Sequence, residues 1–235
     1  MSQLDPCRIE ELRGTLAHGE GVSQEQLNKI AAELTPYKDK LRPKDKTEVL
    51  PLFDAHGNPL GTTAPRWICH LLALRHRCVH ILLLWLSPAL GDVLVLQIRA
   101  WGRDDSPGHV DISVGGHMST KGSDSAEQTA FAEMLEETGL TPEDLQGDLE
   151  RVGGYPFDES RPEDNFYNSE WRDVYVGRVK DDRFGKIHFP DGEVAAMVLI
   201  ALTEALSLLE QDRVPMASAL TQSLPLCLDR DKATG

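Results

Sequence analysis

The chain has 235 residues, which is long enough for one domain with a sizeable hydrophobic core and an appendage, or for two small domains. It carries 24 lysine and arginine residues against 38 aspartate and glutamate residues, a formal net charge of −14, which argues against binding to nucleic acid or to an anionic membrane. The four cysteines have neither disulfide-framework nor zinc-finger spacing, and no stretch has the apolar character of a signal peptide or the length of a membrane span. We therefore expect a cytoplasmic protein whose anionic substrate requires local cations or a metal ion.

The first part of the chain has a helical pattern. Apolar residues recur at spacings of three and four within residues 6–42, and Ser23 is a suitable cap for the second of two helices. The lysine- and proline-rich residues 36–46 are the best linker candidate. We therefore place a helical extension at residues 1–45 and a catalytic domain at residues 46–235.

The rest of the chain alternates between β-forming runs, turns and helical segments. We expect strands at residues 48–53, 78–86, 92–99, 110–114, 149–155, 173–179 and 194–200. We expect helices at residues 125–138 and from Thr203 onward, and a helical or irregular segment at residues 67–74. Strands and helices interleave without regular β-α-β repetition, so the expected fold is an α/β/α sandwich with a mixed β-sheet, not a doubly wound parallel sheet.

The segment from Gly115 to Leu140 carries the strongest chemical pattern. Glu133, Glu136 and Glu137 stand at i, i+3 and i+4, which places three carboxylates on one face of a helix. The other face is predicted to be apolar and to contain Ala130, Phe131, Met134 and Leu135. Helix statistics alone favour a solvated acidic face, but here a strand ending in glycine and a loop precede the helix, which favours a functional site.

This arrangement resembles the signature of the Nudix family, G-x5-E-x7-R-E-U-x-E-E-x-G-U, in which U is an apolar residue. The matching positions are Glu133, Met134, Glu136, Glu137, Gly139 and Leu140. The resemblance implies the Nudix α/β/α fold and a Mg²⁺ ion, or alternatively Mn²⁺, held by Glu133, Glu136 and Glu137, since hard cations prefer oxygen ligands. It also implies hydrolysis of a small organic diphosphate, of nucleoside type, by attack of water at phosphorus.

The signature is incomplete in this chain. Ala132 stands where the family has arginine, and the first glutamate of the motif falls on Asp124. If Gly116 is the leading glycine, the loop has gained two residues. Arg172 or Lys121 is a candidate to replace the missing arginine. These departures leave open a catalytically weak nucleotide-sensing module.

Residues 48–209 also resemble the Nudix branch that contains type I isopentenyl-diphosphate isomerase and its hydrolase relatives. The segments that carry this likeness are residues 53–61, 65–66, 75–77, 107–113, 168–175 and 192–194. The isomerase transfers a proton with a cysteine just before its Gly-His pair, and Gly115 stands there in this chain, so isomerase chemistry is the weaker alternative. His76 and His117 coincide with metal-ligand positions of the isomerase and Glu170 falls near its glutamate pair, although lone histidines more often have structural roles.

The catalytic assignment is Glu136, Glu137 and Glu193, and either Glu137 or Glu193 is the base that accepts the proton from the attacking water. Glu193 follows a glycine and is equally well explained as a surface residue. Neither the substrate nor the choice between monomer and homodimer can be predicted from the sequence.

Four residues are candidates for substrate binding. Arg66 and Arg99 have the forked donors that suit phosphate oxygens, although each is otherwise an ordinary surface cation. Gly115 and Gly116 allow the backbone to approach a ligand where a side chain would block it.

Overall fold

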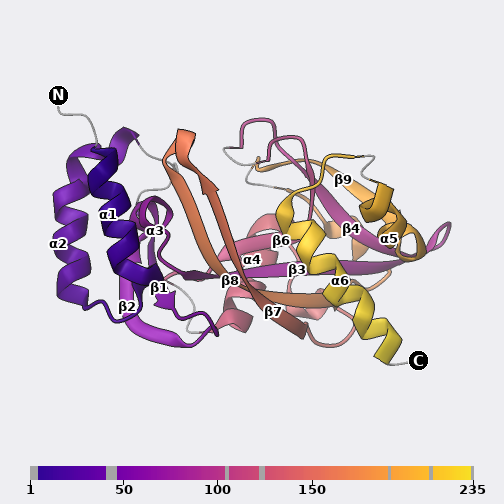
Figure 1. Cartoon of the computed structure of the whole chain (residues 1–235). Coiled ribbons are helices and arrows are strands. Elements are labelled where there is room, and N and C mark those ends of the chain that lie inside the picture. Colours follow the sequence, from indigo (N-terminus) through magenta and orange to yellow (C-terminus); the bar gives the residue numbers. More distant parts are fainter. Residues whose placement is uncertain are drawn as a thin grey trace. The chain divides into compact units, whose positions relative to one another are not determined.

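The protein has a mixed α/β architecture in which helices accompany a large antiparallel sheet (Figure 1). The computed structural model describes residues 5–40, 47–103, 106–121, 125–189, 192–211 and 214–233. The α-helices are α1 (Pro6–Leu16), α2 (Gln24–Leu34), α3 (Arg66–Leu72), α4 (Ala126–Thr138), α5 (Leu202–Gln211) and α6 (Ser218–Ala233). The strands are β1 (Val49–Phe53), β2 (Pro59–Pro65), β3 (His76–Ser87), β4 (Gly91–Arg99), β5 (Val110–Asp111), β6 (Val114–His117), β7 (Glu150–Arg161), β8 (Phe166–Arg178) and β9 (Val194–Ala201). Short 3₁₀ helices are η1 (Ala17–Gly19), η2 (Thr35–Lys40), η3 (Pro142–Asp144), η4 (Pro162–Asp164) and η5 (Phe184–Lys186).

The chain folds as two compact units, and each is described by itself. The first unit comprises Met1–Cys78, His117–Ala126 and Gly154–Arg172. The second comprises Val79–Gly116, Glu127–Gly153 and Asp173–Gly235. None of the helices in the described part of the chain combines the length and the apolar character needed to cross a lipid bilayer.

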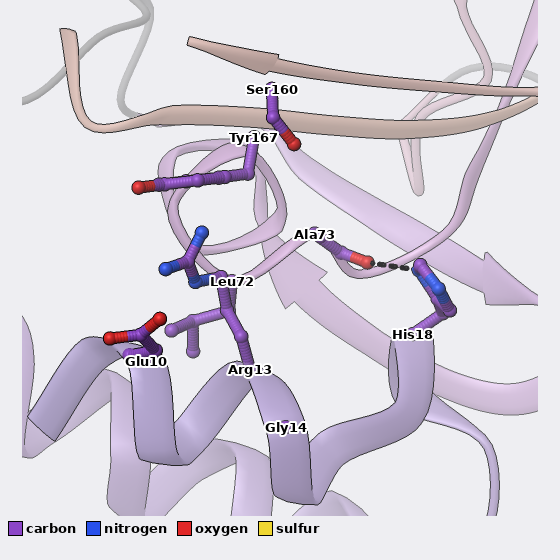
Figure 2. A pocket seen from close by; sticks show the side chains of 8 residues that line it. All are labelled: Glu10, Arg13, Gly14, His18, Leu72, Ala73, Ser160 and Tyr167. Atoms are coloured by element: carbon purple, nitrogen blue, oxygen red, sulfur yellow. Dashed lines mark hydrogen bonds between the residues drawn. The ribbon is translucent and has the colours of Figure 1, made fainter. Parts of the chain in front are cut away.

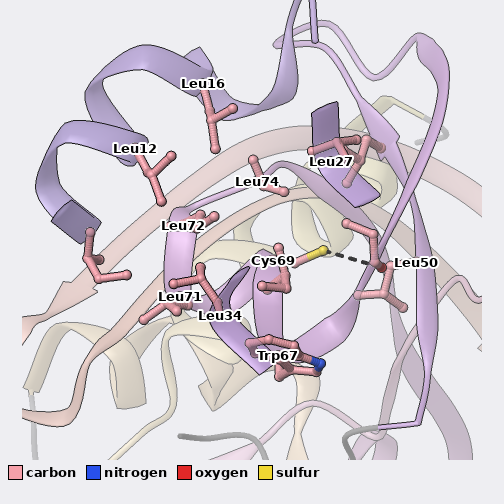
Figure 3. Close-up of a cluster of buried hydrophobic side chains, with 14 residues drawn as sticks. Leu12, Leu16, Leu27, Leu34, Leu50, Trp67, Cys69, Leu71, Leu72 and Leu74 are labelled. Carbon is pink, nitrogen blue, oxygen red and sulfur yellow. Dashed lines mark hydrogen bonds between the residues drawn. The ribbon is translucent and has the colours of Figure 1, made fainter. Parts of the chain in front are cut away.

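The first unit has a leucine-rich core beneath the two N-terminal helices. Strand β1 runs antiparallel to β2 and also pairs with the start of β3, where Leu52 lies opposite His76. The side chains of α1 and α2 pack with those of β1 and α3 in this core (Figure 3). Its fully buried members include Leu27, Leu50, Leu52, Ile68, Leu71, Leu72 and Leu74. The predicted helical extension therefore shares a hydrophobic core with the strand and helix that follow it.

Local signals explain where the N-terminal helices begin and end. Asp5 caps α1 by accepting a hydrogen bond from the backbone of Cys7. Ser23 and Gln26 form a reciprocal capping box at the start of α2, which confirms the predicted cap. Gly19, between the helices, has a φ of +102°, a conformation that favours glycine.

The second unit contains the hairpin of β3 and β4, as predicted. The two strands are antiparallel, with Leu83 opposite Val95 and Ser87 opposite Gly91 at the turn. Strand β4 also pairs antiparallel with β5 and with β9. The core of this unit is filled by Leu82, Leu84, Leu94, Leu96, Val110, Ile112, Val176, Ala205, Leu220, Leu224, Cys227 and Leu228.

The structure differs from the predicted elements at four places. Strand β2 was not predicted, β7 continues to Arg161 beyond the expected residue 155, and β8 begins at Phe166, well before the expected residue 173. The strand expected at residues 110–114 is divided into β5 and β6, because the hydroxyl of Ser113 accepts from the amide of Leu83 at 2.7 Å and donates to the carbonyl of Val95. These side-chain bonds replace ladder bonds there. The predicted domain boundary at residues 45 and 46 lies outside the described residues and stays a prediction.

Candidate active site

Helix α4 presents the acidic cluster. It ends before Gly139, whose φ is +72° and whose amide donates to the carbonyl of Leu135 at 2.9 Å, so the predicted glycine stop is confirmed. Ala130 and Met134 are completely buried, as expected. Leu135, by contrast, is 50% exposed and Glu137 is 8% exposed, so the predicted division into an apolar and an acidic face is wrong at these two positions.

Two of the three carboxylates lie against the glycine pair of β6. Glu137 accepts a long hydrogen bond, 3.4 Å, from the amide of Gly115. The carboxylate of Glu133 lies so close to Gly116 that a Cβ atom at this glycine would overlap it. The backbone at Gly116 is therefore approached closely by a helix carboxylate, and the predicted approach of a ligand to the glycine pair stays a prediction. Glu136 is exposed on the same helix, and Asp124 lies outside the described residues.

The other acid predicted for catalysis, Glu193, directly precedes β9 and contacts the loop that follows β4. Glu193 forms an ion pair with Arg103, and its backbone carbonyl accepts from the amide of Ala100 at 2.9 Å. Arg99, at the end of β4, donates to the buried carboxylate of Asp111 at 2.7 Å. Because this guanidinium neutralises a buried acid, Arg99 has a structural partner that any phosphate would have to share.

The remaining arginine candidates lie in the first unit. Arg66 begins α3 and forms an ion pair with Glu48 at 2.9 Å. Arg172 donates to Glu170 at 2.6 Å, and its guanidinium carbon lies 3.5 Å from the centre of the Phe157 ring. Each of these two arginines therefore forms an ion pair with a glutamate of the first unit.

A second group of potential ligands is buried in the first unit. The ligand atoms of His76, Cys78, His117 and Glu170 all lie within 4.8 Å of one another. Glu170 Oε1 is 3.8 Å from His76 Nε2 and 3.6 Å from His117 Nε2, and neither ring nitrogen has a hydrogen-bond partner in the structure. Two buried nitrogens without partners, beside a carboxylate and a thiol, form a donor set typical of a divalent transition metal.

The ionisation of this group suits metal binding. Burial lowers the pKa of His117 to about 3, with a further contribution from the charge of Arg66, and burial also lowers the pKa of His76. Burial opposes ionisation of Glu170, but Arg172 and His117 outweigh it and hold the pKa of Glu170 well below its ordinary value. Both imidazoles are therefore neutral and the carboxyl ionised near pH 7, as coordination requires.

The NUDIX domain profile matches residues 74–221, more than half of the chain. The chain belongs to the Nudix family. It is 31% identical to "Nudix hydrolase 3" of Arabidopsis thaliana over 121 residues, which are 51% of this chain and 15% of that protein. This chain therefore spans only a small part of that relative.

One solved structure agrees with the family assignment at the level of the fold. DR0079 of Deinococcus radiodurans superposes with a TM-score of 0.57 at 17% identity and covers 77% of this chain and 99% of its own. A mutT/nudix family protein of Listeria innocua gives a TM-score of 0.49 at 21% identity and covers 67% and 94%, respectively. The first of these likenesses confirms the predicted Nudix-type fold.

The Nudix carboxylates fit a hard divalent cation. Glu133 and Glu137 are held by one helix against one strand, and both offer carboxylate oxygens, the ligands that Mg²⁺ prefers. Glu136 adds a third oxygen donor one turn from Glu133. The carboxylate of Glu133 packs directly on Gly116, with no side chain between them.

Sequence reasoning identified His76, His117 and Glu170 but missed Cys78. The signal was available, because His76 and Cys78 are two residues apart on β3 and alternate residues of a strand point to the same face. The sequence also did not predict that His70 lies beside this cluster. Its ring is 4.9 Å from that of His76, a contact that only the tertiary structure reveals.

Proposed function

We propose that this Nudix protein is a Mg²⁺-dependent hydrolase that cleaves the phosphoanhydride of a small organic diphosphate, of nucleoside type. The observation that carries the proposal is the seating of Glu133 on Gly116 and of Glu137 on Gly115, within the matched NUDIX domain. The acidic character of the chain supports a small substrate, since a net charge of −14 repels a polyanion.

In the proposed reaction, the acidic residues bind the metal ion or accept a proton. Glu133, Glu136 and Glu137 would hold the cation, which when bound neutralises the diphosphate and makes an attacking water more acidic. Water attacks one phosphorus, the bridging P–O bond breaks, and two phosphate products leave. The proton passes to Glu137 or to Glu193, which forms an ion pair with Arg103.

The test is product release from a panel of nucleoside diphosphate derivatives, dinucleotides and isoprenoid diphosphates, with and without Mg²⁺. We expect metal-dependent turnover in the wild type and loss of at least about a hundredfold in a Glu136→Gln, Glu137→Gln double variant. Glu127→Gln is the matched control, because this exposed glutamate lies on the same helix outside the cluster. Equal turnover in the double variant and the wild type would exclude the proposed site.

One observation favours a second function, isomerisation of an allylic diphosphate. The cluster of His76, Cys78, His117 and Glu170 provides the metal ligands that such proton transfer would require. Against it, Gly115 stands where the isomerase has its acid/base cysteine, and Cys78 is buried, which raises the pKa of its thiol well above the ordinary value. Carbon-skeleton analysis of the products separates double-bond migration from hydrolysis.

A catalytically weak sensing module is the remaining outcome. Ala132 leaves the metal-binding glutamates without the arginine of the family signature. Saturable, Mg²⁺-dependent binding of nucleoside diphosphates without turnover of any panel member would establish this function instead of hydrolysis.

A further inference from the structure

The first unit contains a cavity of about 390 Å³, a size that is sufficient for a small organic ligand. Its walls come from α1, η1, the end of α3, β7 and β8 (Figure 2). The lining residues are Glu10, Arg13, Gly14, His18, Leu72, Ala73, Ser160 and Tyr167. None of these residues belongs to the Nudix signature or to the buried cluster around Glu170.

The cavity is lined by an acidic and a basic side chain that do not form an ion pair with each other. Glu10 and Arg13 are three residues apart on α1, a spacing at which an acid and a base commonly pair. Within the described part of the chain neither side chain forms an ion pair. Arg13 instead turns toward Tyr167, and its guanidinium carbon lies 3.4 Å from the centre of the ring (Figure 2).

Arg13 also retains hydrogen-bonding capacity. Among the described residues, its Nε is buried without a hydrogen-bond partner, and burying an unpartnered donor is unfavourable. The ring of Tyr167 holds the guanidinium in place without satisfying its N–H groups. Because Nε is enclosed, a ligand oxyanion in the cavity would accept from the terminal N–H groups of the same guanidinium.

One wall of the cavity is fixed by unusual backbone. His18 and Ala73 adopt left-handed conformations, with φ of 61° and 53°, which are unfavourable for residues other than glycine. The Nδ1 atom of His18 hydrogen-bonds the carbonyl of Ala73 at 2.9 Å, and the amide of Arg75 donates to the carbonyl of His18 at 2.9 Å. These bonds hold the wall in one conformation, and strained backbone of this kind is concentrated at ligand sites.

We propose that this cavity binds a small zwitterion of the amino-acid class, with its carboxylate on Arg13 and its ammonium group on Glu10. A polyanion such as a nucleoside diphosphate is disfavoured because the carboxylate of Glu10 lines the same cavity. A plain carboxylate would leave Glu10 facing it without a counter-charge. The inference does not depend on the proposed hydrolase activity.

Isothermal titration of the full chain with the standard amino acids tests the proposal. For each one that binds, we use three further probes: the acid that lacks the amine, the amine that lacks the carboxylate, and inorganic phosphate. We expect at least one amino acid to bind, and its acid and its amine to bind about tenfold or more weakly, the loss expected for one charged hydrogen bond. Absence of saturable binding by every amino acid, or tighter binding of phosphate, overturns the proposal.

Three variants connect the binding to the cavity. Arg13→Gln and Glu10→Gln should each weaken amino-acid binding about tenfold or more, and Glu10→Gln should abolish the preference over the acid without an amine. Gly14→Leu should abolish binding while the protein stays folded, because a Cβ at Gly14 has no atom within 4 Å and the side chain would extend into the cavity. Lys29→Gln, on α2, is the charge control. Wild-type affinity in a folded Gly14→Leu variant would place the ligand elsewhere and refute the site.

Discussion

Gly116 is the residue on which the geometry of the Nudix carboxylates depends most directly. In a Gly116→Ala variant the new methyl group would overlap the carboxylate of Glu133, so this ligand must move. We expect kcat/KM of the Mg²⁺-dependent hydrolysis to fall about tenfold to a hundredfold, since displacing a catalytic group by about 1 Å is enough for such a loss.

The neighbouring glycine provides the comparison for this variant. A Cβ at Gly115 would clash with the end of the Ile112 side chain, which can rotate away, and would be in ordinary contact with the carbonyl oxygen of Val79. Gly115→Ala should therefore show a smaller loss of kcat/KM than Gly116→Ala, with both variants folded by circular dichroism. The reverse order would mean that Glu133 is not a functional ligand.

The candidate site could be predicted from the sequence only in part, and the residues show why. The spacing of Glu133, Glu136 and Glu137 fixes their places on a helix, and glycine is the residue that permits a close approach, so both features can be derived locally. The ion pair of Arg99 with Asp111 and the burial of Glu137 depend on how strands and helices pack. Such tertiary contacts leave no periodic signal in the sequence.

The 3₁₀ turn η3, which follows the Nudix helix, depends on a single buried acid. Asp144 accepts hydrogen bonds from Lys186 at 2.8 Å and from the amide of Thr141 at 3.0 Å. The hydrogen bond from Lys186 is the main cause that lowers the pKa of Asp144 from 3.8 to about 2, although burial opposes ionisation. The turn is therefore held by an ionised carboxylate.

This shift predicts how stability depends on pH. Because the folded pKa lies below the unfolded value, the contribution of Asp144 is present above pH 3.8 and is lost as the pH falls toward 2. We expect it to be at most about 2 kcal/mol, because Lys186 is half-exposed and solvent screens the pair. Urea unfolding should give Asp144→Asn a flatter pH profile in this window, whereas the exposed control Asp148→Asn should follow the wild type.

Helices α1 and α2 contribute to the core of the first unit, and one leucine tests this at the scale of the element. Leu27 on α2 is 2% exposed within the cluster that includes Leu50 and Trp67. Leu27→Ala should lower the free energy of unfolding by about 2–5 kcal/mol, through lost transfer energy and a residual cavity. Leu135→Ala, at a half-exposed site, should change it by less than about 1 kcal/mol. Equal effects of the two variants would show that α2 is not packed as described.

The boundaries of helices were predicted best where a local sequence signal marks the start or the end of the helix. The cap at Ser23 and the stop at Gly139 both act within a few residues, and the predicted helix boundaries there agree closely with the structure. Strand β8 was placed too late because Asn168, Ser169 and Glu170 are polar, yet all three are buried. Burial of polar residues in a strand requires partners from elsewhere in the fold, and periodicity cannot reveal these partners.

At the scale of the whole molecule, the chain contains two donor sets of different chemical hardness. The three glutamates of α4 offer only oxygen, whereas His76, Cys78, His117 and Glu170 offer nitrogen, sulfur and oxygen. Hard Mg²⁺ favours the first set and Zn²⁺ the second. We therefore expect the chain to bind both ions at once, each at its own set.

Metal analysis of protein stripped with chelator and then reloaded measures this directly. Wild-type protein should retain Zn²⁺ after dialysis, and a His117→Asn, Cys78→Ser double variant should bind it at least about tenfold more weakly, since even indirect support of a ligand contributes that much. The Glu136→Gln, Glu137→Gln variant should keep the zinc but lose Mg²⁺-dependent turnover. If instead the glutamate variant loses the zinc, the carboxylates of α4 form the zinc site and the buried cluster is structural. If both variants keep it, neither donor set binds zinc, and the paired His76 and His117 serve only to pack the core around Glu170.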